Sequence, residues 1–338
     1  MARSAHISVM RDEAVGALRA RAGGLYIDGT FGAGGYTRAL LESEGGAKVI
    51  AIDRDPAARK TADSFSEEFG PRFEFFAGPF SHIEKAANGR PIDGIVLDIG
   101  VSSMQIDQAE RGFSFMRSGP LDMRMASEGL TAADAVNHFD HEDLIRIFKA
   151  YGEERRARRC ADFIVRAREV EPFETTEQLA DTIASALGKG GKIHPATRVF
   201  QALRIYINDE LGELYRALIA AETVLAPGGY LSVVSFHSLE DKIVKAFLRR
   251  RAGETSGRSR YLPPDESAVI APSFTLGNRS ARKPKADEID GNARSRSAKL
   301  RVATRTDAAI WSDEESLLPR APSLDDLAAN IRRTGRAR

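Results

Sequence analysis

Four short apolar runs divide the first part of the chain, at residues 25–28, 48–53, 73–76 and 92–98. Between the first three lie stretches, at 37–42 and from 56 to about 65, whose apolar spacing is typical of helices. Three of the runs stay apolar until a terminal aspartate, as parallel strands buried on both faces do. The pattern therefore predicts βαβ units and a parallel sheet.

The alternation stops after the fourth run. Residues 109–196 show no convincing strand, and their apolar spacing predicts helices, which lie at 132–137, 140–150, 153–168 and 176–187. A single long helix is predicted at 198–225, ending at Ala-Pro-Gly-Gly. Further predicted elements are a strand at 230–236, a helix at 238–251, a candidate strand near 267–276, and an alternating, half-exposed edge strand at 298–304.

These elements predict an open α/β sheet interrupted by a helical insertion. At about 150 residues per domain, a chain of 338 residues is long enough for two units. We expect the sheet domain to comprise 1–108 and 197–305, and the insertion to comprise 109–196. Residues 306–338 are expected to form a tail with one short helix at 324–332.

Cysteine content and hydropathy indicate the cellular compartment in which the protein works. The single cysteine, Cys160, cannot form an intramolecular disulfide, and we interpret it as a core thiol. No Cys/His cluster has metal-ligand spacing, so no metal site is expected. No apolar run reaches the roughly 18 residues of a membrane helix, and the N-terminal residues lack the apolar core of a signal peptide. A reducing cytoplasm and no membrane partner are therefore expected.

Positive charge is concentrated toward the C-terminal end. The net charge is +1, yet residues 249–338 carry 19 Lys and Arg against 12 Asp and Glu. This excess suits a polyanionic partner, and it equally suits a solvated tail.

A glycine-rich turn follows the first strand, in Asp28-Gly-Thr-Phe-Gly-Ala-Gly-Gly35. A dinucleotide fingerprint would place a third glycine at 37, where this chain has Thr37, and no P-loop lysine follows. Asp53 ends the second strand, where an acid in a doubly wound fold faces a ribose. The combination favours a nucleoside ligand without a pyrophosphate, such as S-adenosylmethionine, over a tight turn that binds nothing.

The fourth strand ends in Asp98-Ile-Gly-Val-Ser-Ser103. Ligands of open α/β sheets lie outside the carboxyl ends of the strands, so Asp98 is predicted to face the same crevice as Asp28 and Asp53. Helix capping explains one aspartate at a strand end more easily than three.

At this point the chain closely resembles the RsmH (MraW) methyltransferases, which modify the exocyclic amine of a cytidine in the decoding region of small-subunit ribosomal RNA. The matching segments span residues 6 to about 301 and are 26–35, 51–56, 78–81, 98–103, 111–116, 119–125, 151–155, 194–198, 225–229 and 235–241. Several of them, such as Ser-Phe-His-Ser-Leu-Glu-Asp at 235–241, are unlike generic methyltransferase motifs.

The resemblance implies a Rossmann-like class I methyltransferase sheet, mostly parallel with one antiparallel edge strand, and an inserted all-helical domain for substrate recognition. It places S-adenosylmethionine against Gly34, Gly35, Tyr36, Asp53, Phe80, Asp98 and Gln105. Two departures stand out: Tyr36 replaces a common histidine, and Met104 replaces a common proline. The implied partner is small-subunit ribosomal RNA, free or in the assembled subunit; monomer and homodimer both stay open.

The catalytic hypothesis concerns the amine protons. The Asp98 carboxylate or nearby backbone carbonyls are expected to accept them, with Ser102 and Ser103 assisting; the alternative is that Asp98 only binds the cofactor. His237 follows the fifth strand and is either a catalytic group or a structural hydrogen bonder.

The insertion carries the candidate RNA contacts. Arg111, His194 and Arg198 are predicted to bind substrate, and Phe113 and Phe115 to form an interface. The arginines at 155, 156, 158 and 159 either meet RNA phosphates or form a solvated helix face. A rival class is a catalytically inactive RNA-binding assembly factor, against which the intact Asp53, Asp98 and glycines weigh. The other is a nucleotide-dependent oxidoreductase, disfavoured by the missing third glycine.

Overall fold

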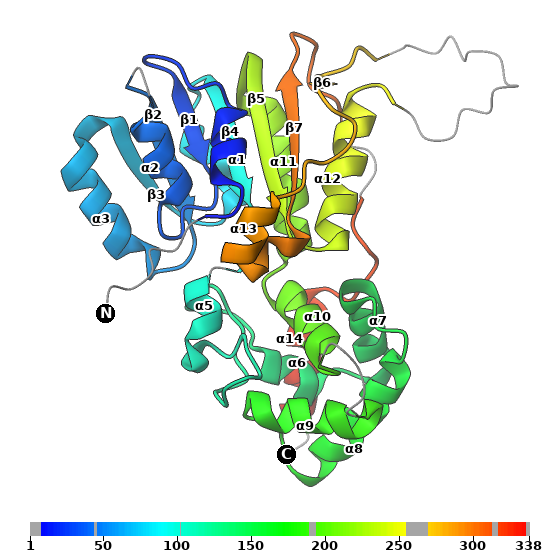
Figure 1. Ribbon diagram of the computed structural model, residues 1–338. Coiled ribbons are helices and arrows are strands. Elements are labelled where there is room, and N and C mark those ends of the chain that lie inside the picture. The colour runs from blue at the N-terminus through cyan, green and yellow to red at the C-terminus, as the bar shows by residue number, and fades with distance from the viewer. Residues whose placement is uncertain are drawn as a thin grey trace, which may run out of the picture. The chain divides into compact units, whose positions relative to one another are not determined.

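The computed structural model describes residues 8–43, 46–101, 103–188, 194–254, 270–312 and 317–335. The chain forms two compact units. The sheet unit comprises Met1–Gly100 and Leu211–Leu318, and the helical unit comprises Val101–Glu210 and Pro319–Arg338. Figure 1 shows the elements of both units.

The sheet unit is built on a seven-stranded sheet in the order β3-β2-β1-β4-β5-β7-β6 (Figure 1). The strands are β1 Leu25–Asp28, β2 Lys48–Asp53, β3 Phe73–Ala77, β4 Ile92–Asp98, β5 Leu225–Ser235, β6 Phe274–Leu276 and β7 Lys299–Arg305. Strands β1 to β5 are parallel, and β7 runs antiparallel to β5. The predicted mostly parallel sheet with an antiparallel strand toward one edge is therefore confirmed.

Two details of this edge differ from the sequence prediction. Strand β6 pairs with β7 and covers it, so β7 is not the outermost strand. Strand β5 begins at Leu225 rather than at 230, because Leu225 pairs with Ile92 before an irregularity in the register. Pro227 and Gly228 lie in this irregular part, where the missing proline N–H and the glycine φ of 84° are tolerated. The part of the candidate strand at 267–269 lies outside the described residues.

Helices accompany the strands of this unit, and their apolar faces form its core. They are α1 Arg11–Gly16, α2 Gly35–Leu41, α3 Ala58–Phe69, α4 Ile83–Ala87, α11 Glu210–Val224 (Glu210 itself falls in the helical unit), α12 Ser238–Arg251 and α13 Ala286–Gly291. Phe31, Phe65 and Phe73 pack edge to face or tilted, with ring centroids 5.2–5.7 Å apart. This cluster fixes the turn after β1 against α3, and the turn carries the glycines of the candidate site.

The helical unit has no strand among the residues described here. Its helices are α5 Ser103–Asp107, α6 Ala132–His138, α7 His141–Gly152, α8 Ala157–Val170, α9 Thr176–Leu187, α10 Thr197–Ile207 and α14 Leu324–Gly335. Capping boxes start α6 at Thr131 and α9 at Thr175, the second at the Thr-Thr-Glu-Gln signal of the sequence. Cys160 is buried in the core of this unit, as expected.

The prediction of a single helix at 198–225 is wrong. This part of the chain forms two helices, α10 and α11, separated at Asn208 and Asp209. Asp209 has a left-handed φ of 46°, which ends a right-handed helix. The Asn208 side chain stabilises the break, because its amide donates to the carbonyl oxygens of Met123 and Arg204. Apolar periodicity continues across the break, so spacing alone does not reveal it.

The C-terminal helix α14 belongs to the helical unit rather than to a separate tail. Leu327 is fully buried in the core of that unit, and the Tyr206 hydroxyl donates to the Ser323 carbonyl at 2.7 Å. No helix in the described ranges is long and apolar enough to cross a membrane.

Candidate active site

The carboxyl end of β1 is organised around a buried aspartate. Asp28 is fully buried, and its Oδ2 accepts hydrogen bonds from the N–H and hydroxyl of Thr37 at 3.1 and 2.7 Å. Its Oδ1 accepts the Thr30 N–H at 3.1 Å. Burial raises the pKa of Asp28 to about 6, although these donors oppose the rise. Asp28 therefore ties the glycine-rich turn and α2 to the end of β1.

Asp53 closes the turn from the neighbouring strand. Its Oδ2 accepts the Gly32 N–H at 2.7 Å, and its Oδ1 accepts the Asp55 N–H at 2.8 Å. Burial raises its pKa, while the two backbone donors lower it. Each carboxylate oxygen keeps acceptor capacity beyond its one backbone donor. The side chain is thus held in place with room to accept hydroxyl protons.

Asp98 differs from the other two aspartates because one of its side-chain oxygens has no partner among the described residues. Its backbone N–H donates to Thr30 Oγ1 at 2.7 Å, which ties the end of β4 to the first turn. Oδ1 is buried and accepts no hydrogen bond from any residue that the structure describes. Burial and then the Asp28 charge raise the pKa of Asp98 well above its ordinary range, with the Tyr36 hydroxyl acting in the opposite direction. A carboxylate in this state readily takes up a proton.

The glycines and Tyr36 form the start of α2. Gly34 adopts a left-handed φ of 81°, and a Cβ there would lie 2.5 Å from the Phe65 ring, so only glycine fits. A Cβ on Gly35 would lie 2.1 Å from Ser8 Oγ. The Tyr36 side chain is buried, and its hydroxyl donates to the Val9 carbonyl. The Tyr36 ring therefore points into the N-terminal segment, and its first-turn N–H is the group left for a ligand.

Phe80 lies in a short 3-10 turn after β3, beside the end of β1. A Cβ on Gly29 would lie at an ordinary contact distance of 3.5 Å from Phe80 Cβ, so the two turns are neighbours, and glycine is needed at 29 because that Cβ would lie 2.4 Å from Leu97 Cδ2. Within the sheet unit the structure thus brings together six predicted cofactor residues at one edge of the sheet, namely Gly34, Gly35, Tyr36, Asp53, Phe80 and Asp98.

The loop after β4 is described only in part. Ser102 lies outside the described residues, and of Ser103 only the backbone, at the start of α5, is described. Gln105 is buried on α5 within the helical unit. The predicted roles of these three residues therefore stay predictions.

His237 is the N-cap of α12 and is held by Glu240. Its Nδ1 accepts the Glu240 N–H at 3.5 Å, and its Nε2 lies 2.9 Å from Glu240 Oε1 without hydrogen-bond geometry. Oε2 of the fully buried Glu240 accepts the N–H groups of Phe236 and His237, at 2.7 and 3.1 Å. The imidazole Nδ1 thus meets the backbone N–H of Glu240 and Nε2 lies beside its carboxylate in a capping box, which gives His237 a structural function whether or not it has a catalytic one.

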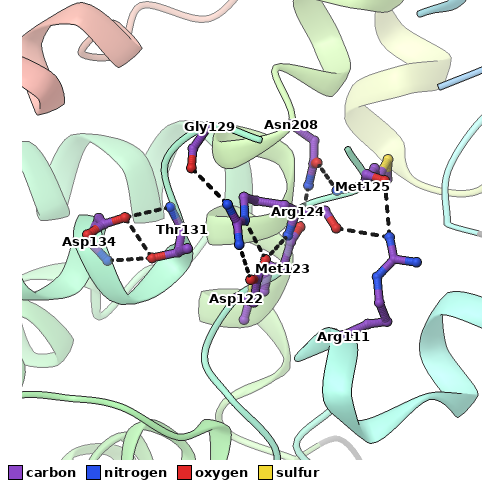
Figure 2. Close-up of polar contacts among 9 residues, drawn as sticks. All are labelled: Arg111, Asp122, Met123, Arg124, Met125, Gly129, Thr131, Asp134 and Asn208. Atoms are coloured by element: carbon purple, nitrogen blue, oxygen red, sulfur yellow. Dashed lines mark hydrogen bonds and ion pairs between the residues drawn. The ribbon is translucent and has the colours of Figure 1, made fainter. Parts of the chain in front are cut away.

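Arg111, in the helical unit, braces a loop of the motif at 119–125 (Figure 2). Its guanidinium donates to the Arg124 and Met125 carbonyl oxygens, both at 3.1 Å. Arg124 in turn makes a bidentate ion pair with Asp122, at 2.9 and 2.6 Å. Met123 between them is fully buried with a left-handed φ of 62°. The network holds this unusual backbone in place, so Arg111 has a structural function alongside the predicted substrate contact.

His194 and Arg198 are exposed at the start of α10. The His194 ring stacks on Phe115, with centroids 4.5 Å apart and planes 25° apart, and Phe115 packs edge-on against Phe200. Arg198 lies 3.9 Å from the Glu154 carboxylate. Phe113 is buried in the core of the helical unit, and its predicted interface function stays a prediction. The structure thus leaves His194 and Arg198 accessible to a ligand.

The residues at the sheet edge fit S-adenosylmethionine. The unpartnered Asp98 Oδ1, the anchored Asp53 carboxylate and the glycine turn without a third glycine suit a nucleoside that carries no phosphates. An open sheet of this topology with these acids at its strand ends defines a class I S-adenosylmethionine-dependent methyltransferase.

Residues 3–306 match the MraW methylase family, and the chain belongs to that family. A ribosomal RNA small subunit methyltransferase H from Maricaulis maris is 58% identical over 316 residues, which cover 92% of this chain and 94% of that protein. Proteins of the same name from Caulobacter vibrioides and Brucella ovis are 55% and 51% identical. They cover 92% and 96% of this chain, and 99% and 94% of their own lengths.

Sequence reasoning missed the partners of the site residues. It did not assign Glu240 to His237, because a capping box usually starts with Ser or Thr, although the i,i+3 spacing of the two residues was visible. It also gave Tyr36 only as a cofactor residue, whereas the hydroxyl joins the N-terminal segment and influences Asp98.

Proposed function

We propose that this enzyme transfers a methyl group to the exocyclic N4 amine of a cytidine in the decoding region of small-subunit ribosomal RNA. Relatives that are 51–58% identical are named ribosomal RNA small subunit methyltransferase H, and the match covers nearly their whole length. The observation that carries the chemistry is the buried Asp98 Oδ1, an acceptor with no partner among the described residues at the end of β4.

The chemistry requires an acceptor because a cytosine amine is a poor nucleophile, its lone pair being delocalised into the ring. When bound, S-adenosylmethionine supplies a methyl group on a positively charged sulfur that leaves readily. Asp98 Oδ1 accepts a hydrogen bond from the amine, favours its rehybridisation, and then takes the proton that methylation makes acidic. The raised pKa of Asp98 suits this last step, and alignment of the amine supplies most of the remaining rate enhancement.

The cofactor pocket of this proposal uses the six residues at the carboxyl ends of the strands, and Gln105 stays a predicted cofactor residue. Asp53 accepts the ribose hydroxyl protons with the acceptor capacity that its backbone donors leave. The N–H groups of Gly35 and Tyr36, in the first turn of α2, face the ligand through the backbone. Such contacts are compatible with tyrosine in place of histidine at 36.

The helical unit is proposed to recognise the RNA, with Arg111, His194 and Arg198 as its contacts. An exposed imidazole stacked on Phe115 offers a face for an unpaired base, and Arg198 a charge for a phosphate. Ser102 and Ser103 are proposed to assist Asp98. The partner is the RNA, free or in the assembled small subunit, and the enzyme acts in the cytoplasm.

The function is tested by incubating the pure protein with methyl-labelled S-adenosylmethionine and either small ribosomal subunits or protein-free small-subunit RNA. We expect label in N4-methylated cytidine after digestion to nucleosides. Binding of RNA without any transfer of label to either substrate would instead identify an inactive assembly factor. Transfer to another base or position would reject the assigned target.

Asp98→Asn tests the proton acceptor. An amide oxygen still accepts a hydrogen bond but cannot take the proton, so we expect kcat to fall about 100-fold or more. The Kd of S-adenosylmethionine, measured by calorimetry, should stay within about threefold. Asp93→Asn, near the opposite end of β4, is the control and should retain kcat. A loss of cofactor affinity that accounts for the whole loss of turnover would make Asp98 a binding residue only.

A further inference from the structure

The exposed face of α12 carries only positive charge. Its buried residues pack on the sheet, and the outward positions Lys242, Lys245, Ala246 and Arg249 follow the i, i+3, i+4, i+7 spacing of one helix face. The exposed face of α3 differs, because Arg59 there pairs with Asp63 one turn away. Surfaces that serve only solubility usually mix both signs, as α3 does.

A groove runs between this face and the edge strands of the sheet unit. Four cations line it, Lys245, Arg249, Arg279 and Arg301, and Leu248 and Val302 form part of its apolar lining. Among the described residues, no acidic side chain lines the groove. Cations from α12, β7 and the segment after β6 are thus directed to one strip of surface.

The carboxylates near the groove do not neutralise it. Glu254 pairs with both Arg249 and Arg279, at 3.0 and 2.8 Å. Asp241 pairs with both Lys299 and Arg301, each at 2.8 Å. Each carboxylate is shared by two cations, so each pair of cations keeps one excess positive charge. The Lys245 ammonium makes no ion pair within the described part of the chain.

We propose that this groove, which we call the α12 groove, binds the phosphate backbone of the RNA substrate, outside the helical unit. The inference rests on the proposed function. Phosphates are favoured because bidentate arginines and a free lysine match them, and because no aromatic side chain of the described residues lines the groove to stack on a base. The ion pairs with Glu254 and Asp241 hold three of the guanidinium groups in place before RNA arrives.

The test compares two triple variants that each remove three positive charges from the sheet unit. Lys245→Gln, Arg249→Gln, Arg279→Gln changes the α12 groove, and Lys48→Gln, Arg59→Gln, Lys60→Gln changes exposed positions on β2 and α3. The Kd of protein-free small-subunit RNA is measured across a salt series, and the Kd of S-adenosylmethionine serves as the check of folding. Since each phosphate contact contributes about 0.7 to the slope of log Kd against log salt, the groove variant should lose about 2 from the slope.

We expect the RNA Kd and the KM for small subunits to rise at least about tenfold in the groove variant, with kcat and cofactor affinity kept. A slope equal to that of the wild type, or an equal loss in the control variant, would overturn the inference. Loss of binding to assembled subunits but not to protein-free RNA would show a ribosomal protein as the partner and equally reject it. Lys245→Glu, which breaks no ion pair, gives the same test if the triple variant does not fold.

Methylation by the wild-type enzyme separates this result from the proposed function. Should the wild type label small-subunit RNA while the groove variant binds RNA normally, only the α12 groove is refuted. Should the wild type label no RNA, the proposed function is refuted, whatever the salt slopes show.

Discussion

At the scale of single residues, the three strand-end aspartates differ in the donors they meet. Asp28 accepts three hydrogen bonds, Asp53 accepts two, and Asp98 Oδ1 accepts none from the described residues. The sequence predicted that the three acids share one edge of the sheet. It could not separate their functions, because the donors to Asp28 and Asp53 come from turns whose geometry only the fold defines. Asp98 is the one with a buried side-chain oxygen that accepts no hydrogen bond from the described residues.

The raised pKa of Asp28 makes the stability of the fold depend on pH. Its folded pKa of about 6 exceeds the ordinary 3.8, so the folded state binds more protons between these values. Its contribution to the free energy of unfolding is therefore present at low pH and is lost as pH rises from about 4 to 6, by about 3 kcal/mol. Urea unfolding should show the free energy of unfolding of the wild type falling, relative to that of Asp28→Asn, as pH rises over this range. Parallel curves would contradict the assignment.

Asp241 is the control of opposite sign. Burial raises its pKa, but Arg301 and Lys299 outweigh burial, and its folded pKa is lowered. The stability that it contributes is present at neutral pH and is lost as pH falls through the folded pKa. Asp241→Asn should therefore change the pH dependence in the direction opposite to Asp28→Asn.

Removing the Tyr36 hydroxyl should lower the stability of the fold without weakening cofactor binding. Tyr36→Phe removes the hydroxyl that donates to the Val9 carbonyl and contacts Asp98, so we expect the free energy of unfolding to fall by about 1–2 kcal/mol. The Kd of S-adenosylmethionine should stay within about threefold, because only the Tyr36 backbone is proposed to face the ligand. Calorimetry and urea unfolding measure the two. A tenfold weaker Kd would show that the side chain takes part in binding.

At the scale of elements, the sequence predicted the strands and most helices because their apolar periodicity matches their burial. The expectation failed where side chains rather than periodicity decide the backbone. Asn208 and Asp209 interrupt an apolar stripe that continues from α10 to α11, and the reason lies in a loop more than 80 residues away, whose Met123 carbonyl the Asn208 amide binds. No local pattern contains this contact.

Replacing Asn208 measures how much its contact with the Met123 carbonyl stabilises the fold. Asn208→Ala leaves the buried Met123 carbonyl and Met125 N–H without their partner, at a cost of about 2–4 kcal/mol in the free energy of unfolding. Asp209→Gly is the matched control, because glycine accepts the left-handed φ of 46°, and it should change stability by less than about 1 kcal/mol. Both are measured by urea unfolding. A small effect of Asn208→Ala would mean that the break is fixed by the backbone of residue 209 alone.

At the scale of the whole molecule, the sequence predicted a sheet with a helical insertion but assigned the C-terminal helix to a separate tail. The helical unit begins at Val101, just after β4, and recruits α14 from the far end of the chain. Leu327 and the Ser323 carbonyl make this connection through tertiary contacts alone, which a sequence pattern does not contain. That the helical unit recognises the RNA, together with the α12 groove of the sheet unit, remains a proposal.

The arginines around the start of α8 give the test of that proposal. Arg156 donates to the Leu187 carbonyl at 2.9 Å and Arg158 pairs with Glu142 at 3.1 Å, so both have structural partners. Arg155 is exposed, and Arg159 lies over the Phe163 ring. We therefore expect Arg155→Gln, Arg159→Gln to reduce the salt slope of RNA binding by about 1.4.

The matched pair Arg156→Gln, Arg158→Gln should leave that slope nearly unchanged and lower the free energy of unfolding instead, because it removes contacts within the helical unit. The two pairs remove equal charge, so a difference in slope cannot come from net charge. If neither pair changes the slope, the arginine cluster is a solvated helix face. The phosphates would then be met elsewhere, at the α12 groove and at the proposed contacts Arg111 and Arg198.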